Sequence, residues 1–368
     1  MDKKIPNLDS LRTLAFLSTF LAHAFFSDSQ DIVAQPLFQW MLSLQEIFFF
    51  GVQLFFVLSG FLITFLMLKE FEDKGRFNLI GFYLRRLLRI WPVYYLVLFF
   101  GFVVFPILKL KITGVAVLEN ASPWYYVVFL SNYDQIVKNQ LPYGVGLGPT
   151  WSVAIEEQFY LFWPLLLLLF RKKRFVYPVI LAMAVSLLVG SIERTNTKSL
   201  IHCMLYLSTG GLFAYVAVYK NRLSHTLTHA PTAIRLSSIP VLLIALYSNC
   251  HFALPYALHL LIAGLMGYII LYQAFGPRPH IDHFTWLRIL GKYTYGFYLY
   301  HSICNFFAKY IIQGIGFGED NLFICLLARP ILSLLLTIVL GMLSYHYFES
   351  HFLRLKERIS NRKASFGV

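Results

Sequence analysis

The sequence predicts an all-α integral membrane protein with about ten transmembrane helices. Hydrophobic residues make up 58% of the 368-residue chain and charged residues only 13%, and the mean hydropathy is +0.64. A soluble domain draws about a quarter of its residues from the charged types, so this chain has too little polar surface to face water on all sides. Its apolar stretches have lengths that cross a bilayer core of about 30 Å.

The expected spans follow one another closely along the chain, except around one long loop. The first has a basic start like a signal peptide, but no small-residue cleavage site follows, so it is interpreted as a helix. The last begins with polar residues and contains Arg329-Pro330. Residues 109–149 predict an external loop with a short re-entrant or interfacial segment. The ten spans are 9–26, 47–68, 88–108, 150–170, 175–190, 200–219, 234–248, 255–274, 288–313 and 322–347.

Lysine and arginine residues gather on one side of this predicted topology. If the N-terminus is cytoplasmic, the cytoplasmic segments receive most of the 31 Lys and Arg residues, as the positive-inside rule expects. Ten spans then return the C-terminus to the cytoplasm, where residues 351–368 form a basic tail after a membrane domain of residues 1–350. The net charge of +13 therefore indicates topology, and no nucleic-acid partner is expected.

Polar residues inside apolar spans are the best candidates for function, because each is costly in lipid unless it is paired or faces a cavity. Arg12 and His23 lie eleven residues apart on the first span, which is three helical turns and places them on nearly one face. The rise per residue puts His23 roughly 16 Å above Arg12, near mid-membrane. A helix-to-helix hydrogen bond is the structural alternative for His23.

Glu156 and Glu157 are the carboxylates that lie well inside a predicted span. Neighbouring helical residues point about 100° apart, so at most one of them faces a given cleft, and Glu156 is preferred. Ser59 and His301 fall at a similar depth, so both are expected to share a cavity with Glu156 and His23. Close helix packing is the alternative for Ser59, because it precedes Gly60, and His301 is as compatible with a structural role as with a site.

A basic cluster opens the third span on the cytoplasmic side. Arg86 and Arg89 are spaced i, i+3 and share a helix face. The alternative is an ordinary positive-inside cluster. With Arg12 they would form a ring suited to a phosphate ligand, which arginine binds through two parallel hydrogen bonds. A carrier with a pyrophosphate group is the natural ligand for such a ring.

At these positions the chain resembles the membrane acyltransferase 3 family, whose members transfer acetyl or other short acyl groups to exported sugars. The resemblance covers nearly the whole chain, and its motifs are weak singly but specific together. They are Arg12 and His23 with ten residues between them after Leu8-Asp9, Phe55-Phe56-Val57-Leu58-Ser59-Gly60-Phe61-Leu62, Arg86-x-x-Arg89-Ile90-x-Pro92, Trp151-Ser152 through Glu156-Glu157-Gln158-Phe159-Tyr160, Tyr298-Leu299-Tyr300-His301, and Phe348-Glu349.

The chain departs from the family pattern at two places. Ser10 stands where the family usually has Gly, and Ser350-His351 follows Glu349 where a Pro two residues after the Glu is common. Neither position touches the expected chemistry. Some relatives carry a fused soluble domain that resembles a hydrolase, whereas this chain is expected to be the stand-alone membrane form.

The resemblance implies an O-acyltransferase that moves an acyl group, acetyl in the common case, from cytoplasmic acetyl-CoA to a hydroxyl of a cell-surface glycan on the outer side. It implies that Arg86 and Arg89, together with Arg12, hold the CoA phosphates and that His23 is the general base. Glu156 would orient His23, stabilise its charge or bind sugar hydroxyls. The other motif residues are expected to line the substrate cavity: Ser59, Trp151, Glu157, Tyr160 and His301.

Several alternatives stay open on the sequence. Transfer is direct or passes through an acyl-enzyme on Ser59 or His23. The acceptor is lipopolysaccharide, capsule, exopolysaccharide, peptidoglycan or a small glycoside, and the oligomeric state is undefined. A transporter or flippase of a lipid-linked glycan is the rival function, although the sequence has no internal repeat.

The remaining expectations concern location and cofactors. The family and the absence of organelle signals indicate a multi-pass protein of a bacterial inner membrane. The histidines show no metal-ligand spacing and the four cysteines are scattered, so neither a metal nor a disulfide is expected. Interfacial aromatic belts explain most of the aromatic residues near the outer face, with sugar stacking as the alternative.

Overall fold

The computed structural model describes residues 5, 7–116, 119–170, 172–192, 197–252, 254–318 and 321–355. These residues form helices and no strand, which confirms the all-α class. Residues 356–368 of the predicted basic tail lie outside this described part. Eight helical segments are long and apolar enough to cross a membrane, and each contains or overlaps a predicted span: Pro36–Lys74, Leu79–Ile112, Thr150–Phe170, Lys173–Ile192, Leu200–Tyr219, Thr232–His251, Leu258–Phe275 and Ile324–Leu355.

The other two predicted spans also fall on helices, but one of them is divided. The first, 9–26, corresponds to α1 (Leu8–Ala24). The prediction of a single helix over 288–313 is wrong at its start, because α15 (Thr285–Leu290) ends before α16 (Thr294–Gly314) begins. Gly291 stands in this break, where a Cβ atom would overlap the backbone of Asp9, so the close approach to α1 requires glycine. The total of ten spans stays a prediction.

The chain divides into two compact units. The first unit consists of Met1–Thr19, Glu46–Phe77 and Gln158–Lys292, and the second of Phe20–Gln45, Asn78–Glu157 and Tyr293–Val368. The helices α1 and α9 (Thr150–Phe170) contribute residues to both units.

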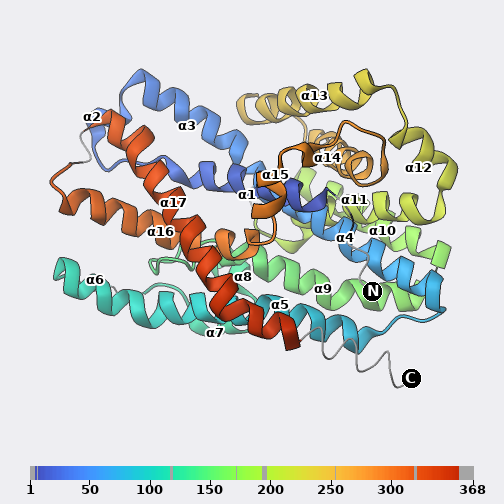
Figure 1. The fold of residues 1–368 in the computed structure, drawn as a ribbon, viewed down its shortest axis with the longest axis horizontal. Helices are drawn as coiled ribbons and strands as arrows, with labels where there is room; N and C mark the ends of the chain where they lie inside the picture. The colour runs from blue at the N-terminus through green and yellow to red at the C-terminus, as the bar shows by residue number, and fades with distance from the viewer. Residues whose placement is uncertain are drawn as a thin grey trace. The chain divides into compact units, whose positions relative to one another are not determined.

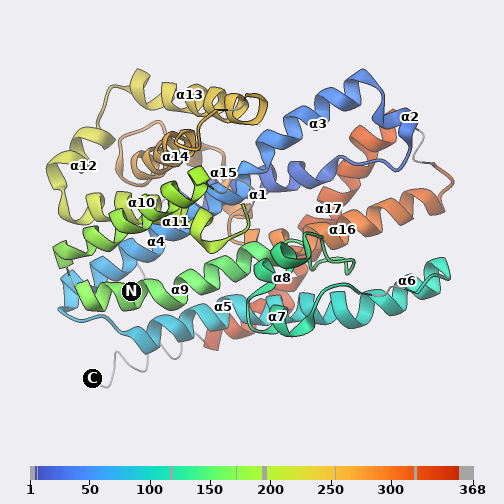
Figure 2. The ribbon, with the colours of Figure 1, turned by 180° about the vertical axis from the view of Figure 1, so that it is seen from behind.

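The first unit is a helical bundle organised around α4 and α11, which lie side by side in Figure 1 and Figure 2. A Cβ atom at Gly60 of α4 would overlap the Leu207 carbonyl, and one at Gly210 of α11 would overlap the Val57 carbonyl. Reciprocal glycines therefore let the two backbones touch, as small residues do in membrane helix pairs. The helices of this unit are α4 (Phe50–Lys74), η2 (Lys172–Phe175), α10 (Val176–Ile192), α11 (Leu200–Tyr219), α12 (Asn221–Thr228), α13 (Thr232–His251), α14 (Leu258–Phe275), η3 (Ile281–His283) and α15.

The second unit contains α16 and α17, which cross in Figure 1 and pack where the Phe297 ring occupies the space beside Gly341. The predicted loop 109–149 begins later than expected, because α6 continues to Thr113, and its described residues form two short helices, α7 and α8. Three π-helical segments, η1, η4 and η5, adjoin the long helices of this unit. Its elements are α2 (Gln30–Val33), α3 (Pro36–Phe48) up to Gln45, α5 (Leu79–Phe99), η1 (Phe100–Val104), α6 (Phe105–Thr113), α7 (Pro123–Val127), α8 (Ser131–Lys138), α16, η4 (Ile324–Ala328), α17 (Arg329–Ser344) and η5 (Tyr345–Glu349).

Candidate active site

Two of the predicted site residues, His23 and His301, meet in the second unit. His23 lies in the last turn of α1 and His301 lies near the middle of α16. Their ring centroids are 5.1 Å apart, and the ring planes are inclined by 55°. His23 is exposed, so a ligand can reach its ring, whereas His301 is fully buried.

The hydrogen bonds of His301 define which of its ring nitrogens carries the proton. Its Nδ1 atom lies 2.5 Å from the carbonyl oxygen of Tyr298. A carbonyl only accepts, so Nδ1 must be the protonated donor. In the neutral ring Nε2 then has a lone pair, and this atom is buried with no hydrogen-bond partner among the described residues. The buried imidazole therefore presents a proton acceptor beside His23.

Polar groups of α16 and α17 hold the chain at the end of α1. Asn305 donates from Nδ2 to the His23 carbonyl at 3.1 Å, and its Oδ1 accepts from the Ser333 hydroxyl. Arg329 donates to the Phe26 carbonyl, and its guanidinium lies 3.6 Å from the centroid of the Phe26 ring. These contacts fix the backbone that carries His23.

Sequence reasoning did not place Asn305 or Arg329 in the site. Asn305 follows His301 by one helical turn, so the i, i+4 spacing on one face was a usable signal. Arg329 is 2% exposed and stands in an apolar segment. Its charge in such a position was the second signal.

The two carboxylates of α9 have different surroundings. Glu157 accepts from the Trp91 indole at 3.1 Å, and its charge interacts with that of Arg86. Glu156 is half-buried and lies within electrostatic range of Tyr298, the residue that holds His301. Ser152, one turn before Glu156, shares a hydrogen bond of 2.5 Å with the Tyr298 hydroxyl. The contacts therefore direct Glu157 toward α5 and connect the start of α9 with the His301 helix.

The predicted arginines of α5 lie beside acidic groups. Arg86 and Arg89 are half-buried, and the charge of Arg89 interacts with that of Glu349 in η5. Glu349 also accepts from the Ser344 hydroxyl at 3.2 Å, and Ser344 shares a hydrogen bond with Tyr300 at 2.8 Å. In the second unit the arginines of α5 therefore face carboxylates of α9 and η5.

Three predicted site residues belong to the first unit. Arg12 pairs with Asp9 at 2.7 Å on the first turns of α1. The Tyr160 hydroxyl donates to Ser59 at 3.3 Å, and Ser59 adjoins the glycine contact of α4. The structure therefore brings Ser59 and Tyr160 together. Arg12 lies in a different unit from Arg86 and Arg89, so the predicted ring of three arginines stays a prediction.

The remaining motif residue, Trp151, is half-buried in the first turn of α9. No group of three or more His, Cys, Asp or Glu within the described ranges is arranged to hold a metal ion. Chemically, the arrangement offers an accessible imidazole beside a buried one, and arginines beside carboxylates. Such groups suit proton transfer and the binding of an anion.

Residues 5–346 match the model of the acyltransferase 3 family, which describes an acyltransferase domain. Among curated proteins, the "Peptidoglycan O-acetyltransferase OatA" of Listeria monocytogenes is 26% identical over 95% of this chain and 56% of its own length. The "Putative peptidoglycan O-acetyltransferase YrhL" of Bacillus subtilis is 27% identical over 94% of this chain and 54% of its own length.

A third relative is the "Putative O-acetyltransferase SACOL0978" of Staphylococcus aureus, 27% identical over 98% of this chain and 59% of its own length. The chain therefore spans little more than half the length of these curated relatives. No solved structure gives a significant match.

Proposed function

Because the chain belongs to the acyltransferase 3 family, we propose that it is a membrane-embedded O-acyltransferase that moves an acyl group, acetyl in the simplest case, from cytoplasmic acyl-CoA to a hydroxyl of a cell-surface glycan. Two relatives are named for peptidoglycan O-acetylation, which makes peptidoglycan the first acceptor to test. The relatives described above are bacterial, and the proposed location is the cytoplasmic membrane of a bacterium.

The observation that carries the proposal is the pairing of exposed His23 with buried His301. His23 acts as general base, because it is accessible and an imidazole changes protonation near neutral pH. His301 is a positioning residue: its Nε2 lone pair stabilises the imidazolium that His23 becomes. Asn305 keeps His23 in place through the backbone.

In the proposed reaction the acyl group passes directly from CoA to the acceptor oxygen. The acceptor hydroxyl gives its proton to His23 while its oxygen forms a bond to the thioester carbonyl carbon. The carbon–sulfur bond then breaks, CoA leaves as a thiolate, and the imidazolium returns the proton to that sulfur. The products are an O-acyl glycan and free CoA, and His23 is again neutral.

Arg86 and Arg89 are the proposed ligands of the CoA phosphates, because a guanidinium binds phosphate through paired hydrogen bonds. Both interact with carboxylates, Arg86 with Glu157 and Arg89 with Glu349. The donor phosphates would therefore compete with these carboxylates for the arginines. Arg12, bonded to Asp9, is proposed as a third ligand.

The test measures binding of radiolabelled acetyl-CoA and release of CoA by the full chain in nanodiscs, first with water as acceptor and then with peptidoglycan fragments. We expect His23→Ala to bind donor and lose turnover, and Arg86→Ala/Arg89→Ala to lose donor binding. His225→Ala is a matched control, because exposed His225 also lies over a second histidine, His229, at 4.0 Å. A wild-type protein that binds neither acetyl-CoA nor longer acyl-CoAs would exclude the proposed donor and favour glycan transport.

A further inference from the structure

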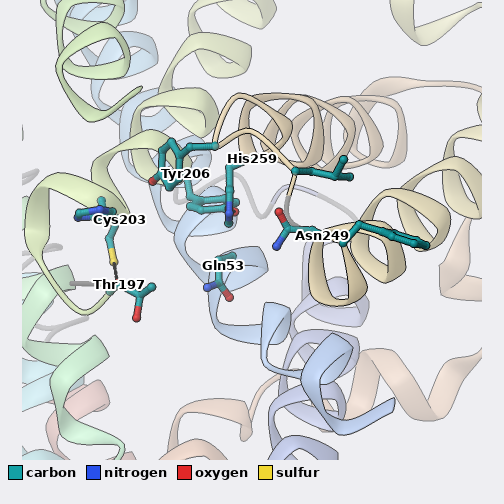
Figure 3. Close-up of a pocket in the computed structure, with 10 residues that line it drawn as sticks. Gln53, Thr197, Cys203, Tyr206, Asn249 and His259 are labelled. Carbon is teal, nitrogen blue, oxygen red and sulfur yellow. Dashed lines mark hydrogen bonds between the residues drawn. The ribbon is translucent and has the colours of Figure 1, made fainter. Parts of the chain in front are cut away.

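The first unit contains a pocket that the proposed chemistry does not use. It lies at the end of the bundle where α11 and α14 begin and α13 ends, and Gln53 of α4 completes its wall (Figure 3). Its volume is about 270 Å³. Sites for drug-sized ligands occupy roughly 300 to 1,000 Å³, so this pocket suits a molecule with a single ring.

The pocket lining mixes polar side chains with apolar ones. Its polar groups are the amides of Gln53 and Asn249, the imidazoles of His202 and His259, the hydroxyls of Thr197, Tyr206 and Tyr256, and the Cys203 thiol, and Phe252 and Leu254 add apolar surface. None of the described residues that line it is Asp, Glu, Lys or Arg, so nothing in its wall would neutralise a phosphate. The Gln53 amide oxygen is buried and has no hydrogen-bond partner within the described part of the chain.

Aromatic rings also line the pocket. Tyr256 stacks on His259 with centroids 4.6 Å apart and planes inclined by 26°. The Tyr206 hydroxyl shares a hydrogen bond of 2.6 Å with His259 Nδ1. Figure 3 shows Gln53, Asn249 and His259 reaching the same space from three helices. A sugar ring, with hydroxyls around its edge and apolar C–H faces, complements such a lining better than a lipid chain would.

Two neighbouring contacts hold side chains of the pocket lining in place. Ser199 caps α11 and shares a hydrogen bond of 2.7 Å with His202 Nδ1. The Tyr256 ring occupies the space beside Gly190, where a Cβ atom would overlap it. A preformed site of this kind loses little conformational entropy when a ligand binds.

We propose that this pocket binds one uncharged sugar ring of the acceptor glycan, an inference that rests on the proposed acyltransferase function. The predicted topology places residues 191–199 and 249–254, which supply part of the pocket lining, on the outer side, where an exported glycan would be met. Binding there would hold the acceptor by a ring and contribute to its affinity.

The experiment combines two measurements on the full chain in nanodiscs. Saturation-transfer NMR reports binding of N-acetylglucosamine without any acyl donor, and steady-state kinetics report KM for an N-acetylglucosamine oligomer with acetyl-CoA. We expect Tyr256→Ala and Asn249→Ala to weaken sugar binding and raise KM at least tenfold, with kcat changed less than threefold and hydrolysis of acetyl-CoA by water unchanged. Tyr247→Ala is the matched control, since Tyr247 stacks on His251 at 4.2 Å outside the pocket.

The outcomes separate this inference from the proposed function. If the wild-type protein does not hydrolyse acetyl-CoA, the proposed acyltransferase function is wrong. If hydrolysis is intact but both pocket variants bind sugar and acceptor as the wild type does, the pocket assignment is wrong. Unchanged thermal unfolding of Asn249→Ala shows that its effect on binding is not a loss of folding.

Discussion

The α4–α11 contact of the first unit and the surroundings of His23 in the second unit are held together differently. In the first unit, α4 and α11 meet through Gly60 and Gly210, whose missing side chains let backbone contact backbone. In the second unit, side-chain hydrogen bonds join the elements: Asn305 holds the carbonyl of His23, and Ser152 bonds with Tyr298. Close backbone packing tolerates no change in volume, whereas hydrogen-bonded polar groups inside apolar segments usually serve a function.

The helices themselves show the same contrast. The π-helical segments found within the described ranges, η1, η4 and η5, all belong to the second unit. Such segments often occur at functional sites, because they turn side chains out of the regular helical order. The comparison therefore assigns structural rigidity mainly to the first unit and the proposed acyl-transfer chemistry mainly to the second.

The largest effect should come from His23→Ala, which tests whether the second unit carries the chemistry. A general base contributes about 10² to 10⁴ in rate, so turnover of acetyl-CoA should fall by that factor. The midpoint of thermal unfolding should stay within about 2 °C of the wild type, because His23 is exposed and its backbone bond to Asn305 is kept. A variant that retains turnover would remove His23 from the mechanism.

Gly210→Ala should have the next largest effect, and it tests the glycine contact of the first unit. The added Cβ atom would overlap the Val57 carbonyl, so we expect a loss of about 1–3 kcal/mol in the free energy of unfolding. Gly264→Ala is the control of opposite sign: its Cβ meets nothing within 4 Å, and alanine favours helix by about 1 kcal/mol. Equal effects of the two substitutions, measured by chemical unfolding, would refute the close contact.

Asn305→Ala should have a smaller effect on activity, and it sharpens the claim that hydrogen bonds organise the second unit. Losing the bond to the His23 carbonyl costs about 1 kcal/mol, which corresponds to roughly a fivefold fall in kcat. KM for acetyl-CoA should not change. Thr337→Ala is the control on α17, because the Thr337 hydroxyl donates to the Ser333 carbonyl at 2.7 Å and interacts with the Cys304 thiol of α16. A fall in both variants alike would indicate general loosening of α17.

The smallest effect should come from Lys74→Ala at the exposed end of α4. Lys74 pairs with Glu70 at 3.2 Å across one helical turn, and its side chain is 65% exposed. Such a pair contributes about 0.3–0.5 kcal/mol, so the unfolding midpoint of the variant should lie close to that of the wild type. The small difference between the two midpoints should disappear at high salt, which screens the pair. A loss above about 1 kcal/mol would show that α4 depends on more than its glycine contact.

The helices were largely predictable from the sequence because span length follows from hydropathy alone. The break at Gly291 was not, since it depends on the backbone of Asp9, which is far away in the sequence. Likewise, residue periodicity separated Glu156 from Glu157 by 100° but did not reveal that Glu157 bonds with Trp91. Ser10, noted as a departure from the family pattern, donates a hydrogen bond to Asp282, a partner that no local pattern indicates.

In the π-helical segment η5, the position of Glu349 depends on the number of residues in the turn. A π turn holds one more residue than an α turn, so it can be read as a tolerated single-residue insertion in the helix that continues α17. Deleting exposed Tyr347 would restore an α turn in which Glu349 follows Ser344 by four residues instead of five, and this keeps the two residues on one helix face. Adding a residue at this point would instead turn Glu349 about 100° away from Ser344 and Arg89 without any change in its own chemical identity. In this segment the gain of one residue is as consequential as a change of residue.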